Sequence, residues 1–212
     1  MKIESVKSIL TKAVLAGFMI GIGGIVYLSV ENNVVGSFLF SFGLFSIIQF
    51  GFTLYTGKVG YIPERKPVYL REVALAIVGN LIGTGLCAAL LRCTRHWDKV
   101  HAAAEKLVDA KTGDGVLSVL VLSVFCGLLM YLAVENSRIS KEKNNFIAAV
   151  FGTVLPVMVF ILCGFNHSVA DSFYIFAGRI DAVGALYLVL AVIGNAIGGM
   201  LVPLAKKLFD KD

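Results

Sequence analysis

The stretch "LPVMVFILCGFNHSVADSF", residues 155–173, joins a strongly apolar run to an Asn, a His and an Asp. The apolar residues are typical of a helix that spans a membrane, whereas Asn166 and His167 are residues that such a helix rarely exposes to lipid. Ionisable side chains at membrane depth usually face the interior of a helix bundle or a water-filled path. The stretch therefore predicts a membrane span that is interrupted at a functional position.

The composition supports a membrane protein. Of 212 residues, 58% are hydrophobic and only 16% are charged, and the mean hydropathy is +0.84. A soluble domain of this length rarely has so few charges to cover its surface. We expect an all-α integral membrane protein with six transmembrane helices, because apolar runs of about 20 residues recur between charged segments. The predicted spans are residues 13–30, 34–57, 73–91, 116–134, 146–177 and 182–205.

The charges predict topology rather than a nucleic-acid partner. The net charge is +5, but the Lys and Arg residues form no basic patch interleaved with aromatic residues. If the N-terminus is cytoplasmic, most of the 19 Lys and Arg residues fall in inner segments, among them Lys2 and Lys211. The positive-inside rule then places both termini in the cytoplasm of a multi-pass protein of the inner (cytoplasmic) membrane.

The first dozen residues carry three lysines, with Val6, Ile9 and Leu10 at helical spacing. This pattern favours an interfacial amphipathic helix over the charged region of a signal peptide, and we expect no cleavage.

The potential metal ligands are poorly spaced. His96 and His101 are five residues apart in a charged loop, which misses the i, i+4 spacing of a helical zinc site. The four cysteines form no CxxC pair and are interpreted as small buried apolar residues; they are Cys87, Cys93, Cys126 and Cys163. We predict no metal site and no cofactor.

Three short motifs recur in the same order in both halves of the chain. "YLSVEN" (27–32) returns as "YLAVEN" (131–136), "GFT" (51–53) as "GFN" (164–166), and "IVGNLIGTGL" (77–86) as "VIGNAIGGML" (192–201). Because each half holds three spans, the second copy must enter the membrane from the opposite side. This predicts an inverted repeat with a solute path near the midplane. The single channel domain, 1–212, then divides into repeat one (about 1–91), a linker (92–115) and repeat two (116–212).

The third and sixth spans carry small residues for close packing. Gly79 and Gly83 in one, and Gly194 and Gly198 in the other, form small-xxx-small faces. The residues that follow the first glycine of each pair, Asn80 and Asn195, are expected to hydrogen-bond across these helix contacts.

The second and fifth spans are interrupted at matching positions, by "QFGFTLYTGK" (49–58) and by "CGFNHSVADSF" (163–173). Non-helical backbone at membrane depth is tolerated only where protein buries it or where it lines a cavity. Broken helices also expose free amides, which attract anions. Both breaks are therefore expected to lie beside the solute path.

At these positions the chain resembles the formate/nitrite transporter family of pentameric anion channels. Residues 155–173 resemble the fifth-helix signature of that family, "FTLYTGK" (52–58) its second-helix omega loop, and "IGNAIGG" (193–199) its last span. The resemblance implies a homopentamer of aquaporin-like protomers, each with its own pore, a central pore His and two hydrophobic constrictions.

The resemblance also assigns residues. It implies a pore centre of His167, Thr56 and Asn166, and an anion-attracting vestibule residue, Lys111. The cytoplasmic constriction falls on Leu44, Leu54 and Tyr55, and the periplasmic constriction on Phe40 and Phe160. The sequence departs from the family pattern at Gly127, Asp171 and Ser172.

These features favour a channel for small monovalent weak-acid anions such as formate, nitrite or hydrosulfide. An anion loses hydration energy in an apolar throat, and a central His that donates a hydrogen bond or a proton offsets that loss. A channel for a small neutral solute or ammonium is the alternative, because the inverted repeat suits either. An intramembrane enzyme using His167 and Asp171 lacks a nucleophile motif, so we predict no enzyme. The expected partners are the anion or its conjugate acid and membrane lipid.

Overall fold

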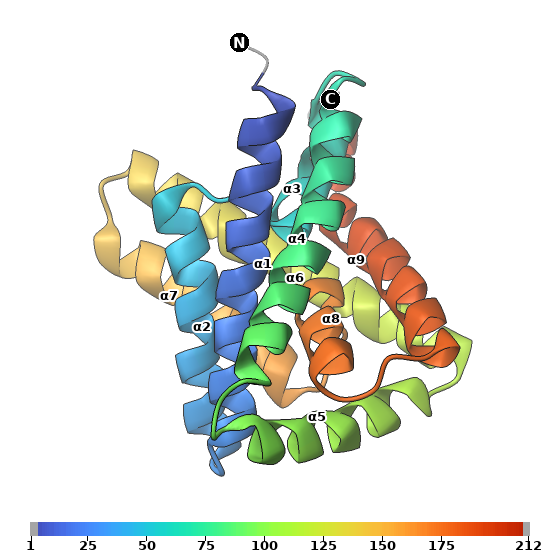
Figure 1. Ribbon diagram of the computed structural model, residues 1–212. Coiled ribbons are helices and arrows are strands. Elements are labelled where there is room, and N and C mark those ends of the chain that lie inside the picture. The colour runs from blue at the N-terminus through green and yellow to red at the C-terminus, as the bar shows by residue number, and fades with distance from the viewer. Residues whose placement is uncertain (1–3, 210–212) are drawn as a thin grey trace.

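Long apolar runs become helices because a helix satisfies every backbone hydrogen bond internally, as lipid requires. The computed structural model describes residues 4–209, so Lys2 and Lys211 lie outside the described residues. The helices of this range are α1 (Val6–Ser29), α2 (Asn33–Phe50), α3 (Tyr55–Lys58), the 3-10 helix η1 (Val59–Glu64), α4 (Tyr69–Leu91), α5 (Trp97–Thr112), α6 (Val116–Glu142), α7 (Phe146–Leu162), α8 (Ser168–Ala177) and α9 (Ala182–Phe209) (Figure 1).

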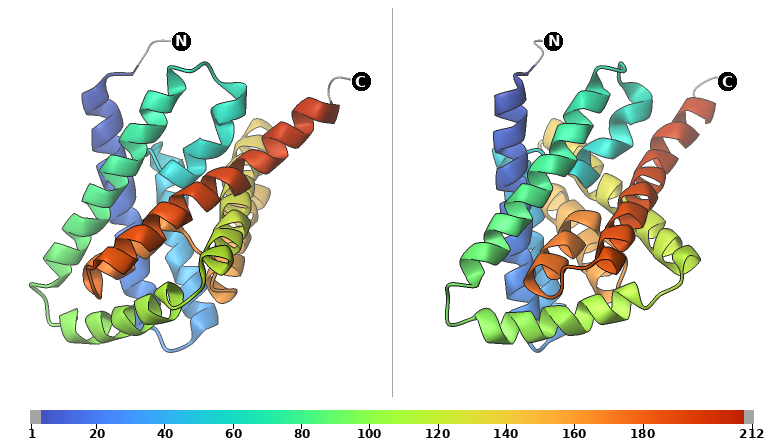
Figure 2. Two further views of the ribbon diagram at one scale, coloured as in Figure 1. Left: turned by 90° about the vertical axis from the view of Figure 1, so that its right-hand side faces the viewer. Right: turned by 45° about the vertical axis from the view of Figure 1, so that its right-hand side comes forward.

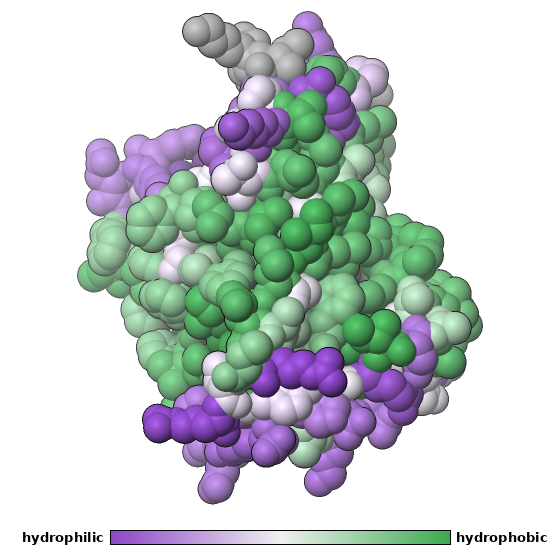
Figure 3. Space-filling model, in the orientation of Figure 1, coloured by the Kyte–Doolittle hydropathy of each residue, from purple (hydrophilic) through white to green (hydrophobic). Residues whose placement is uncertain are grey.

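Five of the described helices are long and apolar enough to cross a membrane: α1, α2, α4, α6 and α9. Helix α7 is apolar but has 17 residues, so the count of six spans stays a prediction. On the face shown in Figure 3, an apolar band lies between two polar ends. The described parts of the two chain termini lie at the same end of the molecule (Figure 1).

Helix α1 is a single helix from Val6 to Ser29, with the Ser5 side chain accepting a hydrogen bond from the Ser8 amide at its start. The prediction of a separate interfacial helix over the first dozen residues is therefore wrong for residues 6–12. Starting a second helix costs a new nucleation step, whereas extending an existing helix adds one backbone hydrogen bond for each residue that is fixed.

The linker 92–115 was expected to be a charged loop, and most of it is helix α5 instead. Val100, Ala104 and Val108 recur every four residues and are buried, whereas the charged residues occupy the other faces. This amphipathic helix lies across the end of the molecule opposite the two termini (Figures 1 and 2). Its position follows from its two faces, because the apolar face packs against the bundle and the polar faces stay exposed.

The two halves of the chain pack in the same way: α1 lies against α2 and α4, and α6 lies against α7 and α9. Glycines make the close contacts. A Cβ on Gly83 would lie 2.1 Å from the Val14 carbonyl oxygen, and one on Gly198 would lie 1.9 Å from that of Val124. The small residues of the third and last predicted spans thus let helix backbones touch.

The "YLSVEN" match does not follow this correspondence. Residues 27–32 include the last turn of α1 and the residues after it, whereas residues 131–136 lie well inside α6. The predicted equivalence of these two motifs is therefore wrong. The matches at residues 51–53 and 77–86 do occupy equivalent elements in the two halves.

We expect Gly83→Ala to destabilise the protein by about 1–3 kcal/mol, because the added methyl group must push apart the α1 and α4 backbones. Gly85 is the matched control, two residues along the same helix. A Cβ there would meet only the Phe176 ring, at 3.6 Å. The melting temperature in detergent should fall for Gly83→Ala and stay close to wild type for Gly85→Ala. Equal melting temperatures for the two variants would show that this contact is loosely packed.

Candidate functional site

The chain leaves helical geometry at two matching glycines. Gly51 follows α2 with φ 67°, and Gly164 follows α7 with φ 68°. This left-handed conformation is accessible to glycine at little cost, and it ends a helix sharply. Each glycine is followed by a short extended segment, and then by α3 or α8.

A buried asparagine holds the first of these segments in place. The Tyr55 amide donates to Asn80 Oδ1 at 2.8 Å, and Asn80 Nδ2 donates to the carbonyl oxygens of Ala13 at 2.8 Å and Thr53 at 2.9 Å. Asn80 is 0% exposed. The bond to Ala13 joins α4 to α1. The other two satisfy the Thr53 carbonyl between α2 and α3 and the free amide of Tyr55 at the start of α3.

Asn195 does the same for the second segment. Its Oδ1 accepts from the Ser168 amide at 2.9 Å, and its Nδ2 donates to the carbonyl oxygens of Ser123 and Asn166, both at 2.8 Å. Both asparagines bond across helix contacts, as the sequence predicts, to Ala13 and Ser123. Their bonds to the interrupted backbone are an addition that the sequence did not predict.

Two further glycines give these asparagines room. A Cβ on Gly17 would lie 2.2 Å from the Asn80 carbonyl oxygen, and one on Gly127 would lie 2.3 Å from that of Asn195. No side chain fits at Gly127 while α6 and α9 keep this separation. Gly127, one of the departures from the family pattern, therefore lets α6 and α9 pack closely.

His167 caps the N-terminus of α8 and is 1% exposed. Its Nδ1 accepts a hydrogen bond from the Ala170 amide at 3.0 Å, so the proton of the neutral ring resides on Nε2. Nε2 lies 3.0 Å from Thr56 Oγ1, to which it can donate. The structure thus brings together two of the residues predicted for the pore centre, one from each interrupted segment.

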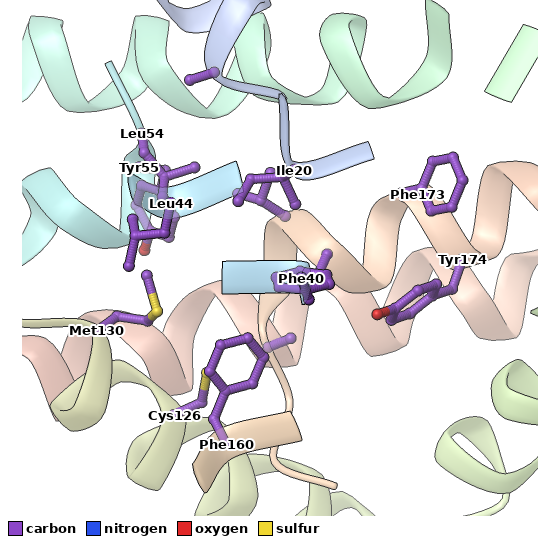
Figure 4. Close-up of a cluster of buried hydrophobic side chains, with 14 of the residues drawn as sticks. Ile20, Phe40, Leu44, Leu54, Tyr55, Cys126, Met130, Phe160, Phe173 and Tyr174 are labelled. Atoms are coloured by element: carbon purple, nitrogen blue, oxygen red, sulfur yellow. The ribbon is translucent and has the colours of Figure 1, made fainter. Parts of the chain in front are cut away.

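Aromatic rings lie beside His167. The Phe160 ring stacks on the imidazole with ring centroids 5.2 Å apart, and it meets Phe40 edge to face at 5.9 Å. All three side chains are buried, and Figure 4 shows the two phenylalanines. The predicted periplasmic constriction residues therefore contact each other, and Phe160 also contacts the predicted pore His.

The residues predicted for the cytoplasmic constriction also gather in one place. Leu44, Leu54 and Tyr55 are buried and lie together in Figure 4. The Tyr55 hydroxyl donates to the Val192 carbonyl oxygen at 2.8 Å, which ties this side chain to α9.

Lys111 and Asn166 lie beside the second interrupted segment, at the same N-terminal end of α8 as His167. Lys111 Nζ donates to Asn166 Oδ1 at 2.9 Å, and the side-chain Nδ2 of Asn166 donates to the Val119 carbonyl oxygen at 3.2 Å. The Asn166 side chain therefore contacts Lys111 and α6, while His167 and Thr56 contact each other. A recess of about 40 Å³ lies here, lined by Lys111, Phe160 and Asp171 among others.

Asp171, one of the departures from the family pattern, contacts Lys111, which its position in the sequence does not predict. Its Oδ1 lies 3.3 Å from Lys111 Nζ, and its Oδ2 accepts from the Tyr187 hydroxyl at 2.7 Å. The available signal was its spacing: Asp171 follows His167 by four residues and so extends along the same helix.

Interrupted helices that bury a His beside apolar rings, inside an apolar helical bundle with two similar halves, define a membrane transport protein. The particular family follows from the sequence. The pattern of the formate/nitrite transporter family matches residues 2–207, and the chain belongs to that family.

Individual relatives agree with this assignment. The chain is 27% identical over 189 residues to the transporter YrhG of Bacillus subtilis (79% of this chain, 68% of that protein). It is 26% identical over 184 residues to the formate channel BtFdhC of Bacillus thuringiensis (79% and 69%). Among solved structures, a pentameric formate channel with formate bound superposes with a TM-score of 0.81 at 22% identity, covering 98% of each chain. This superposition supports the all-helical channel fold.

Proposed function

We propose that the protein is a channel for small monovalent weak-acid anions such as formate, nitrite or hydrosulfide. The observation that carries the proposal is the buried contact between His167 Nε2 and Thr56 Oγ1 beside the Phe160 ring. A small anion that enters an apolar passage loses its hydration shell. His167 and Thr56 are two hydrogen-bonding groups at that depth that can replace part of the lost hydration.

The two hydrophobic constrictions are assigned from the family resemblance and from the buried side chains beside this contact. Phe40 and Phe160 form the outer constriction, and Leu44, Leu54 and Tyr55 form the inner one. His167 contacts Phe160 of the outer set and Thr56, which follows Tyr55 of the inner set. The named formate channels among the relatives support a carboxylate substrate, and the channel requires no covalent chemistry of its residues.

Flux measurements in proteoliposomes test the proposal. Stopped-flow uptake of formate, nitrite and hydrosulfide is expected to exceed that of ammonium and glycerol, with empty liposomes as the control for passive leak. Faster uptake of ammonium or glycerol would instead support the alternative, a channel for neutral solutes or ammonium. That alternative is favoured by one observation, the pairing of Lys111 with a carboxylate.

We further propose a homopentamer in the cytoplasmic membrane with both termini in the cytoplasm. The superposition on a pentameric channel supports this assembly, and the many exposed apolar side chains suit helices that face lipid or neighbouring protomers. The common end at which the two chain termini lie suits an even number of spans (Figure 1).

We expect native mass spectrometry in mild detergent to give the mass of five protomers, each of 22.8 kDa. Cysteine accessibility tests the orientation: with the exposed Cys93 and Cys163 replaced by Ser, Ser5→Cys should react with an impermeant maleimide only in inside-out vesicles. A stable monomer or dimer, or labelling of Ser5→Cys from the periplasm, would contradict these assignments.

A further inference from the structure

Lys111 and Asp171 form a charge pair at the recess beside Phe160. Lys111 comes from α5 and Asp171 from α8, and their side chains are only 11% and 3% exposed. Helix α5 crosses the end of the bundle, which is how a residue of the linker reaches the second interrupted segment (Figure 2). Water screens such a site weakly, so a charge left unpaired here would act strongly on anything that enters the recess.

The hydrogen bonds of Lys111 are already used. Four oxygen atoms lie within 3.4 Å of its Nζ: Asp171 Oδ1, Asn166 Oδ1 and the carbonyl oxygens of Gly164 and Phe165. An ammonium group has three protons to donate. An arriving anion must therefore displace an existing acceptor before Lys111 can donate to it.

Asp171 is held against this ammonium group by a second contact. Its other carboxylate oxygen accepts from Tyr187 on α9, and its backbone amide donates to the His167 carbonyl oxygen within α8. Other ionisable side chains near the pair are Tyr27, Tyr174 and Cys126, which are neutral at physiological pH. The charges of Lys111 and Asp171 thus cancel.

We propose that Asp171 is a specificity-determining residue, which neutralises Lys111 and makes the outer recess a weak binding site for free monovalent anions. This inference rests on the proposed transport function and changes the assignment of Lys111 within it. Lys111 alone would attract anions, whereas the pair attracts them little, since each charge offsets the other at nearly the same distance. Asp171 therefore sets how strongly the recess prefers an anion to a neutral molecule of the same shape.

The test compares three proteins in a formate uptake assay. Asp171→Asn keeps the shape of the side chain and a partner for Tyr187, but it gives the recess a net positive charge. We expect the half-saturating formate concentration to fall about tenfold, since an unscreened unit charge within a few ångströms contributes at least this much to binding. An unchanged or higher half-saturating concentration would overturn the inference.

The double variant Lys111→Met with Asp171→Asn is the matched control, because it contains the same Asn and no charge at either position. Its half-saturating concentration should match wild type within about threefold, because removing a neutral pair as a unit is often tolerated. The double variant also tests the inference if Asp171→Asn alone does not assemble. A tenfold rise in its half-saturating formate concentration would show that Lys111 attracts anions despite Asp171, and would overturn the inference. A wild-type protein that carries no weak acid would overturn both the proposed function and this inference, whereas wild-type transport with an unaltered Asp171→Asn would overturn the inference alone.

Discussion

Replacing Asn195 by Ala is expected to prevent the protein from assembling. Three buried backbone groups would lose their partner: the Ser168 amide and the carbonyl oxygens of Ser123 and Asn166. Each buried group left unsatisfied costs about 1–3 kcal/mol, so the total is at least about 3 kcal/mol. This loss is a large fraction of the stability of a typical domain.

The same substitution at Asn80 should have the same effect, because Asn80 makes three equivalent bonds in the first half of the chain. Asn33→Ala is the matched control, since Asn33 is exposed at the start of α2. The measurement is the yield of oligomer by size exclusion in mild detergent, together with its melting temperature. Normal assembly of both Asn80→Ala and Asn195→Ala would mean that water replaces the lost bonds at these sites.

The sequence predicts these interrupted segments because their chemistry is local. A glycine, an aromatic residue and a polar residue occur at residues 51–53 and again at 164–166, and a Gly-Asn pair occurs in each later span. Gly51 and Gly164 adopt the left-handed conformation that ends a helix. The groups that then leave the helix need partners, and an asparagine, which both donates and accepts, can satisfy several of them.

The outer end of the site depends on contacts between distant residues, which the sequence alone did not predict. Most of the charged linker is a helix. Its buried residues, such as Val100 and Ala104, are small and four positions apart, so they give only a weak apolar pattern in the sequence. Without that helix, Lys111 is interpreted as a loop residue, and nothing places it against Asp171, 60 positions away. The match between residues 27–32 and 131–136 gave a wrong equivalence for a related reason. Similar short sequences need not occupy equivalent positions in two helices.

His167 is the residue whose substitution should most change transport. Its two ring nitrogens have different tasks: Nδ1 accepts from the Ala170 amide and caps α8, while Nε2 faces Thr56. His167→Ala removes both contacts, and loss of the cap alone costs about 1 kcal/mol. His167→Asn is the sharper variant, because asparagine is a preferred N-cap residue and should keep the Ala170 bond while losing the reach to Thr56.

We therefore expect both variants to assemble, with Asn closer than Ala to the wild-type melting temperature. Thr56→Ser, which retains the hydroxyl group, is the control with near wild-type flux, and Thr56→Val should share part of the defect.

For transport, we expect both His167 variants to carry formate at least about tenfold more slowly than wild type, because a hydrogen bond to a charged group contributes about 1.5–3 kcal/mol.

The pH dependence of transport follows from the hydrogen bonds of the His167 ring. While Nδ1 accepts from an amide, the imidazole is neutral and its one proton lies on Nε2, so a second proton must arrive with the substrate. Lower external pH supplies that proton, so wild-type uptake should rise as pH falls. His167→Asn can donate a hydrogen bond but cannot exchange a proton, so it should transport slowly with a flatter pH profile. If His167→Ala and His167→Asn both match the wild-type rate and pH profile, His167 serves only to cap α8, and the weak-acid mechanism proposed for this channel is wrong.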